Sequence, residues 1–186
     1  LDRKQLIGSL GYVPQYPADF KVNLVVEEEI AFILENLRFP PHLIKDRVAE
    51  LLEQLNITHL RHRLITELSS GELQRVALAI AFAPKPPILI LDEPMARIDP
   101  KTEIELATIL KDLAREGTLV IVFEHHLDYL LAKADHIVVL KEGKIIDEGA
   151  SKEIVHSLQE IDLPEVSMIK TLKHKHFFTI HEAVNG

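Results

Sequence analysis

The sequence contains no cysteine and no tryptophan, and it has no long hydrophobic run. Without cysteine, the chain cannot form disulfides, zinc-thiolate sites or a cysteine nucleophile. Apolar stretches such as 76–83 and 119–123 are far shorter than the roughly 20 residues that a membrane-spanning helix needs. We therefore expect a chain that does not itself cross a membrane.

Positive charge is also scarce, because 21 Lys and Arg residues face 29 Asp and Glu residues, which gives a net charge of -8. A protein that binds duplex nucleic acid through a broad basic face is a poor fit to this balance, so no nucleic-acid partner is expected. The first five residues, Leu1 to Gln5, show no basic stretch followed by an apolar core. With no secretory signal, a cytosolic location is expected.

What the chain does have is an alternation of helical and strand patterns over 186 residues, 47% of them hydrophobic. Apolar spacing and breaker residues predict helices at about 30–37, 44–55, 72–82, 101–115, 127–134 and from 151 onward, and strands at 6–14, 88–91, 119–123, 137–140 and 144–146. The last two strands flank Glu142 and Gly143, so they form a hairpin. This order favours an α/β fold with a mainly parallel sheet core. Residues 161–186 form a C-terminal tail whose pattern favours no particular structure.

Two adjacent carboxylates, Asp92 and Glu93, end an apolar strand. Open α/β folds bind ligands at the carboxyl edge of the sheet, and phosphoryl transfer needs one acidic group to help hold Mg²⁺ and one to polarise the attacking water. The structural alternative is a pair of carboxylates that cap a turn between a strand and a helix. The pair alone favours this alternative.

A helix start with two hydroxyls and a glycine precedes that strand, at Ser69, Ser70, Gly71 and Glu72. Exposed N–H groups and the helix dipole favour an anion there, and glycine lets the backbone approach it. The alternative is an ordinary capping box, in which Ser69 and Glu72 satisfy each other's backbone groups.

Two further polar side chains stand next to predicted strands. His125 follows the second buried strand, where its imidazole can donate a hydrogen bond to a terminal phosphate or its attacking water. Gln15 follows the first strand and can bind the metal or the water. Each has a simple alternative, a surface histidine and a turn residue respectively.

The order of these motifs resembles the ATP-binding subunits of ABC transporters over roughly residues 6–157. A glutamine loop, a helical insertion, the Leu-Ser-Ser-Gly-Glu motif, an apolar run into Asp-Glu-Pro, an Ile-Asp-Pro motif and a strand-terminal histidine follow one another. The resemblance implies site roles for Gln15 (Q-loop, nucleotide and Mg²⁺), Ser69, Ser70, Gly71 and Glu72 (signature motif, nucleotide), Asp92 (Walker B, Mg²⁺), Glu93 (catalytic base), Asp99 (D-loop, nucleotide) and His125 (switch histidine). The wording at 12–15, 26–32, 34–37 and 124–127 is similar to the energy-coupling factor branch, whose ATPases drive uptake of vitamins or of cobalt and nickel ions.

This resemblance also implies an architecture and partners. We expect an ABC-type ATPase domain at 1–160 with a helical subdomain at about 23–82, and ATP and Mg²⁺ as cofactors. Family members pair head to tail, so a second ATPase subunit is expected, as a homodimer or heterodimer. The helices at about 23–63 are the expected contact with a transmembrane subunit, which places the protein at the cytoplasmic face of the cell membrane, as a peripheral subunit.

One family motif is missing from the sequence. The phosphate-gripping Walker A pattern G-x-x-x-x-G-K-[ST] does not occur, and the single Gly-Lys pair, Gly143 and Lys144, is followed by Ile145. We interpret the chain as part of a P-loop ATPase domain truncated before the Q-loop, which by itself binds ATP poorly and is inactive. Two alternatives stay open: a soluble ABC ATPase that acts in DNA repair or on ribosomes, and a non-catalytic module that completes a partner's ATP site. Arg97 also departs from the pattern, because a small residue is more usual there.

Overall fold

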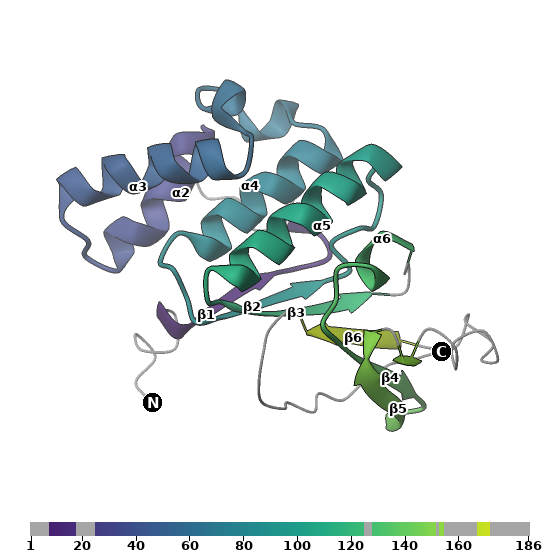
Figure 1. The fold of residues 1–186 in the computed structure, drawn as a ribbon. Coiled ribbons are helices and arrows are strands. Elements are labelled where there is room, and N and C mark those ends of the chain that lie inside the picture. Colours follow the sequence, from purple (N-terminus) through teal and green to yellow (C-terminus); the bar gives the residue numbers. More distant parts are fainter. Residues whose placement is uncertain (1–7, 18–24, 125–127, 152, 155–166, 172–186) are drawn as a thin grey trace.

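The computed structural model describes residues 8–17, 25–124, 128–151, 153–154 and 167–171. The strands in this part of the chain are β1 (Leu10–Val13), β2 (Ile88–Asp92), β3 (Leu119–Glu124), β4 (His136–Lys141), β5 (Lys144–Ala150) and β6 (Ser167–Thr171). The helices are α2 (Val26–Asn36), α3 (Pro41–Gln54), α4 (Ser70–Phe82), α5 (Pro100–Arg115) and α6 (Asp128–Leu131), with short 3-10 turns η2 (Thr58–Leu60) and η3 (Ile65–Glu67). The strands form one sheet in the order β1-β2-β3-β6-β4-β5 (Figure 1).

The first three strands make the parallel core that the sequence predicts. β1 pairs with β2, and β2 pairs with β3, both in parallel. In this register Tyr12 lies opposite Ile90, and Asp92 lies opposite Phe123. The chain returns from β2 to β3 through α5, as a parallel crossover requires. The carboxyl ends of all three strands therefore meet at one edge of the sheet, where the predicted site residues stand.

The other half of the sheet is antiparallel. β4 and β5 form the predicted hairpin. β6 was not predicted, and it lies between β3 and β4, antiparallel to both. The predicted tail at 161–186 therefore contains a strand, and a run as short as Ser167–Thr171 gives little period-two signal on which to base that prediction.

Some predicted boundaries were wrong. Among the described residues of the strand expected at 6–14, only Leu10–Val13 form a strand, and among those of the helix expected at 127–134, only Asp128–Leu131 form a helix, the short α6. After α6 the chain makes a turn in which the Lys133 and Ala134 N–H groups donate to the Leu130 carbonyl at 3.0 and 2.9 Å. The helix expected from 151 onward lies mostly outside the described residues.

Helices α4 and α5 cover one face of β1, β2 and β3 (Figure 1). The strand residues on that face, Leu89, Leu91, Val120 and Val122, are fully buried. On the opposite face a smaller apolar cluster joins β3 to β4, through Ile121, Val138 and Leu140. Tyr12 also points to that face and is 49% exposed.

Helices α2 and α3 lie beside α4, and Arg47 ties α3 to the end of α4. Its guanidinium donates to the carbonyls of Ala83 at 3.0 Å and Phe82 at 2.9 Å, and it lies 5.2 Å from the centre of the Phe82 ring. One buried cation thus binds two carbonyls at the end of a helix, where carbonyls lack partners within the helix; the Phe82 carbonyl also accepts the Lys85 N–H at 3.0 Å. The helical subdomain boundaries at 23–82 stay a prediction, since one hydrophobic core runs through these helices and the sheet.

Among the described helices, none is both long and apolar enough to cross a membrane.

Candidate functional site

Gln15 and Glu93 meet at the carboxyl edge of the parallel strands. The Gln15 side-chain amide Nε2 donates a hydrogen bond to Glu93 Oε2. This contact follows from the pairing of β1 with β2, which places the residues that follow each strand next to each other. Since the bond uses the amide nitrogen of Gln15, its amide oxygen is still an acceptor for a cation or a water.

Glu93 occupies an unusual backbone conformation. Its φ is 43°, in the left-handed region that non-glycine residues seldom adopt. Its N–H donates to the Phe123 carbonyl of β3 at 2.9 Å, which fixes the turn directly after β2. The strained turn thus directs the carboxylate of Glu93 toward Gln15.

Asp92 has a neighbour that the sequence analysis missed. The Tyr12 hydroxyl donates to Asp92 Oδ2 at 3.3 Å. Partial burial, and then the charge of Asp92 and this hydrogen bond, raise the pKa of the Tyr12 hydroxyl above its ordinary value. The signal was present in the sequence, because Tyr12 pairs with Ile90 and therefore shares a sheet face with the residue two positions further along β2.

These side chains match the donor set that Mg²⁺ prefers. A carboxylate oxygen from Asp92 and an amide oxygen from Gln15 are hard ligands, and Mg²⁺ commonly keeps several waters while one or two protein carboxylates hold it. Within the described residues no cluster of three or more His, Asp or Glu side chains could hold a metal by itself. The residues therefore fit a magnesium ion, which the Asp92 carboxylate and the Gln15 amide oxygen would hold in part.

A second missed residue, Glu124, lies buried beneath the same edge. Glu124 is only 2% exposed, and its Oε2 accepts a hydrogen bond from the Met95 N–H at 3.1 Å. Met95 lies in the loop that follows Glu93, so this carboxylate supports that loop from the end of β3. His125 comes next in the chain and lies outside the described residues, so its predicted role stays a prediction.

The predicted capping box at the start of α4 is present. The Glu72 N–H donates to Ser69 Oγ at 3.3 Å, while the Ser69 N–H and hydroxyl each lie 2.8 Å from Glu72 Oε2. The backbone bond from Ser69, and then its hydroxyl, hold the pKa of the Glu72 carboxyl below its ordinary value. The structural alternative for Ser69 and Glu72 is therefore realised, and both Ser69 and Ser70 are exposed.

Ser70 and Gly71 face the loop and helix that follow β2. The Ser70 hydroxyl donates to the Arg97 carbonyl at 2.7 Å. A Cβ on Gly71 would come within 2.9 Å of Thr102 Cγ2, so this glycine permits close packing of α4 on α5. Glycine at position 71 therefore has two possible reasons: the close packing on Thr102, and the predicted approach of a phosphate.

Asp99 acts as the cap of α5. Its Oδ1 accepts from the N–H groups of Lys101 and Thr102, both at 3.1 Å, and its Oδ2 accepts from the Thr102 hydroxyl at 2.5 Å. The Thr102 hydroxyl, followed by its backbone N–H, lowers the pKa of Asp99. Aspartate before proline at a helix start is a capping signal that the sequence already contained.

A cavity of about 460 Å³ opens beside the start of α4. Its lining consists of Asn56, Ile57, His59, Ser69, Ser70, Gly71, Glu72, Arg75, Asp99, Lys101, Thr102 and Glu105. The four residues predicted as the signature motif line it, and so does Asp99, the predicted D-loop residue. The remaining predicted residues that the structure describes, Gln15, Asp92 and Glu93, form a separate group at the sheet edge, and the Ser70–Arg97 contact links the two groups.

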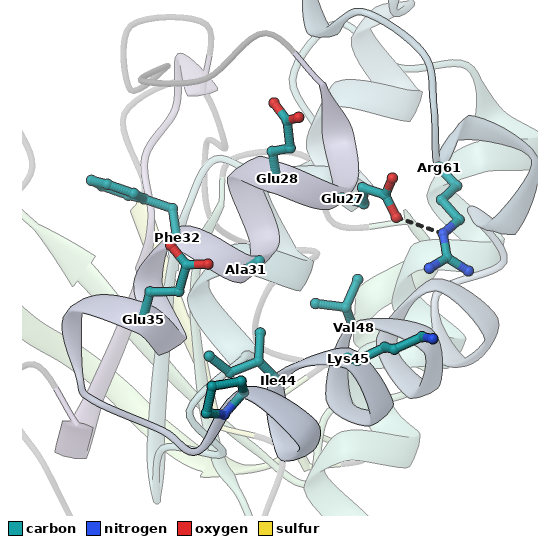
Figure 2. A pocket seen from close by; sticks show the side chains of 10 residues that line it. Glu27, Glu28, Ala31, Phe32, Glu35, Ile44, Lys45, Val48 and Arg61 are labelled. Carbon is teal, nitrogen blue, oxygen red and sulfur yellow. Dashed lines mark hydrogen bonds and ion pairs between the residues drawn. The ribbon is translucent and has the colours of Figure 1, made fainter.

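A third feature is a groove of about 400 Å³ between α2 and α3. Figure 2 shows its lining: Glu27, Glu28, Ala31, Phe32, Glu35, Pro41, Ile44, Lys45, Val48 and Arg61. Glu27 is held by Arg61 at 2.6 Å and by His62 at 2.9 Å, and the Arg61 contact dominates in lowering the pKa of Glu27. The groove lies within the surface predicted to contact a membrane subunit.

Comparison with known proteins gives a consistent result. The sequence profile of the ABC transporter family matches residues 1–96. Over 162 residues, the chain is 35% identical to the energy-coupling factor transporter ATP-binding protein EcfA of Methanothermobacter thermautotrophicus, covering 87% of this chain and 52% of that protein. It is 41% identical over 146 residues to the putative HMP/thiamine import ATP-binding protein YkoD of Bacillus subtilis, covering 77% of this chain and 27% of that protein. A putative ABC transporter ATP-binding protein of Treponema denticola is 37% identical over 172 residues, and this match covers 92% of this chain but only 34% of that relative.

Solved structures show the same relationship. The cbiO1 protein of Clostridium perfringens, described as part of the ABC transporter complex cbiONQ, has a TM-score of 0.76 and 32% identity, over 84% of this chain and 62% of that one. The ATP-binding cassette MJ0796, solved as a dimer in a post-hydrolysis state with ADP and Pi, has a TM-score of 0.69 and 26% identity, over 81% of this chain and 68% of that one. The chain thus spans roughly a third of the length of the first curated relatives that it matches. By its motifs, its fold and these matches, the chain belongs to the ABC transporter family.

Proposed function

We propose that this chain is part of an ATP-hydrolysing subunit of an importer, and that it couples hydrolysis to uptake of a vitamin or a metal ion. The observation that carries the proposal is the contact of Gln15 with Glu93, beside Asp92, at the carboxyl edge of the parallel strands. The thiamine-import and energy-coupling factor relatives support the transport role.

In this proposal Glu93 accepts a proton from the water that attacks the terminal phosphate, and Gln15 orients that water. A positioned general base contributes about 10²- to 10⁴-fold to a rate. Asp92 and the Gln15 amide oxygen hold Mg²⁺, which when bound neutralises charge on the phosphates. Tyr12 orients the Asp92 carboxylate through its hydroxyl. His125, by family resemblance, stabilises the terminal phosphate.

The start of α4 contacts ATP that a second ATPase subunit holds. Ser69, Ser70 and Gly71 line the cavity of about 460 Å³, where the α4 N-terminus favours an anion. The dimeric form of MJ0796 supports this arrangement. A phosphate grip of the Walker A type is absent from the 186 residues, so it comes from outside them.

The groove between α2 and α3 is the proposed contact with a transmembrane subunit. Ile44 and Val48 give it an apolar surface on the side of α3, and Phe32, Glu28 and Glu35 of α2 also line it (Figure 2). The relation to cbiO1, part of a larger transporter complex, supports such a partner. The subunit then sits at the cytoplasmic face of the membrane.

A second candidate is a non-catalytic module that only completes a partner's ATP site. The lack of a Walker A motif favours it, because the α4 start can serve a partner even if this chain grips no phosphate of its own. The two candidates differ in whether Glu93 is needed for turnover.

The test measures ATP turnover by the assembled transporter that contains this chain. If the chain takes part in hydrolysis, Glu93→Gln and Ser69→Arg both remove turnover at the sites they serve. If the chain is only a completing module, Ser69→Arg removes turnover and Glu93→Gln does not. Calorimetric titration of Mg-ATP into the chain alone should give little heat, and saturable binding at micromolar ATP would contradict the proposal that the grip lies elsewhere.

A further inference from the structure

Arg97 adopts a backbone conformation suited to glycine. Its φ is 65°, and the residue lies in the loop between β2 and α5, four positions after Glu93. A long side chain in the left-handed region is strained, and such strain persists where surrounding contacts hold the residue in place. We therefore expect contacts of the Arg97 side chain or backbone to hold it in a conformation that glycine would adopt more easily.

The contacts of Arg97 reach two elements that are distant in sequence. Its guanidinium lies 4.9 Å from the centre of the Tyr16 ring, and its carbonyl accepts the Ser70 hydroxyl at 2.7 Å. A cation over an aromatic face is an attractive pair at this distance. Arg97 consequently joins the turn after β1 to the first residue of α4.

The residue next to Tyr16 is Gln15, whose side chain contacts Glu93. Two neighbouring residues of one turn are thus held by two residues of one loop: Gln15 by Glu93, and Tyr16 by Arg97. Because Gln15 and Tyr16 share a peptide unit, fixing the ring restricts where the Gln15 amide can lie. Loss of the Arg97 contact should release Gln15 even though Gln15 itself is unchanged.

We propose that Arg97 is a positioning residue: through the Tyr16 ring it keeps the Gln15 amide on Glu93, and through Ser70 it ties that arrangement to the start of α4. The inference rests on the proposed function only in that the reaction it prepares is ATP hydrolysis. Arg97 itself touches none of the reacting atoms.

The direct test observes the Gln15 side-chain amide by ¹H–¹⁵N NMR in the 186-residue chain, with its signals assigned from their loss in Gln15→Glu. Arg97→Leu and Tyr16→Leu should each move these signals toward the values of a solvated glutamine. Tyr16→Phe keeps the ring and Arg97→Lys keeps a cation, so both should leave the signals close to their original positions. Arg115→Leu, at an exposed arginine of α5, is the matched control for loss of a surface charge. Signals that stay in place in both Arg97→Leu and Tyr16→Leu would overturn the proposal.

The second readout separates kcat from KM for ATP in the assembled transporter. The strength of an exposed cation–π pair corresponds to an effect of about two- to fivefold. Arg97→Leu should lower kcat by that factor with KM unchanged, and Arg97→Lys should restore most of it. A change in KM alone would contradict a role in arranging Gln15. If the unaltered assembly shows no turnover at all, the proposed function fails, while the amide signals still decide whether Arg97 positions Gln15.

Discussion

The side chains of Gln15 and Glu93 form a hydrogen bond although 78 positions separate them in the sequence. The parallel pairing of β1 with β2 creates this contact, and α2, α3 and α4 all lie in the chain between them. The helical insertion therefore begins at the carboxyl edge of the sheet, after β1, and ends at the opposite edge, where β2 starts; β2 then brings the chain back to Glu93. Movement of these helices relative to the sheet would act directly on Glu93, the proposed catalytic carboxylate.

Replacement of Glu93 by Gln should abolish turnover in the assembled transporter without loss of the fold. The amide cannot accept a proton from water, and loss of a general base costs about 10²- to 10⁴-fold in rate. Initial-rate assays of phosphate release measure the effect. Glu148→Gln, at an exposed glutamate of β5, is the matched control and should keep full activity.

Loss of the Arg47 guanidinium should destabilise the packing of α3 on α4. Arg47→Met leaves the carbonyls of Phe82 and Ala83 without their charged donor. Hydrogen bonds to a charged group contribute about 1.5–3 kcal/mol each, so we expect a loss of about 2–4 kcal/mol in the free energy of unfolding. Urea denaturation measures this loss.

Burial lowers the pKa of the Arg47 guanidinium, and the nearby Glu50 carboxylate partly opposes this change. Arg47→Lys should give an intermediate loss, because one ammonium on a flexible stem does not reproduce the planar fork. Arg115→Met, at an exposed arginine, should change stability little. Equal stability of Arg47→Met and the unaltered chain would rule out this role.

Gly71→Ala should destabilise the chain through Thr102. The added methyl would lie 2.9 Å from Thr102 Cγ2, and overpacking of this kind typically costs about 1–3 kcal/mol. Thr102→Ser removes that methyl but keeps the hydroxyl that binds Asp99. In the Thr102→Ser background, Gly71→Ala should therefore be neutral or stabilising by up to about 1 kcal/mol, because alanine is the better helix former. Thermal unfolding of the four chains measures the coupling, and additive effects would contradict the close contact.

The capping box of α4 should make stability depend on pH. The pKa of Glu72 is lower in the folded chain than its ordinary value of 4.5, so ionised Glu72 stabilises the fold. This contribution is complete above pH 4.5 and is lost as the pH falls through the lower folded-state pKa. Glu72→Gln keeps the hydrogen-bonding shape without the charge.

The difference in free energy of unfolding between the unaltered chain and Glu72→Gln should therefore be constant from pH 7 to pH 5. Below pH 5 this difference should become smaller. Chemical denaturation of both chains at a series of pH values measures it. A difference that grows on acidification would have the wrong sign for a carboxyl with a lowered pKa.

Reversal of charge in the groove between α2 and α3 should weaken binding of a membrane subunit. Glu28 and Glu35 line this groove, while Glu53 is an exposed glutamate of α3 outside the lining. Glu28→Lys and Glu35→Lys should reduce the amount of chain that co-purifies with the transmembrane subunit, and Glu53→Lys should not. Equal retention of all three variants would place the contact elsewhere.

Much of the architecture could be predicted because its signals are local. The apolar run of β2 and the Ser69–Glu72 spacing of the capping box both lie within a few residues, and both are present. The contact of Gln15 with Glu93 needed one further step, the assumption that β1 and β2 are parallel neighbours.

The missed residues act through distant partners. Glu124 supports Met95 from another strand, Arg47 caps a helix that begins 23 positions later, and Arg97 meets Tyr16 across the site. Nothing in the local sequence identifies such partners, because topology brings them together. Asp99 was predicted as a site residue, and its additional capping role could be read from the proline that follows it.

The position of β6 has a consequence for synthesis on the ribosome. The hydrogen-bonded ladder that connects β3 to the β4–β5 hairpin passes through β6, which comes last in the described chain. A ribosome adds about 5–20 residues per second, so β1 to β3 and their covering helices are translated seconds before Ser167–Thr171 emerges. During that interval β3 and β4 each have one edge without its final partner, because both edges pair with β6. The continuous sheet can therefore be completed only after translation has passed residue 171.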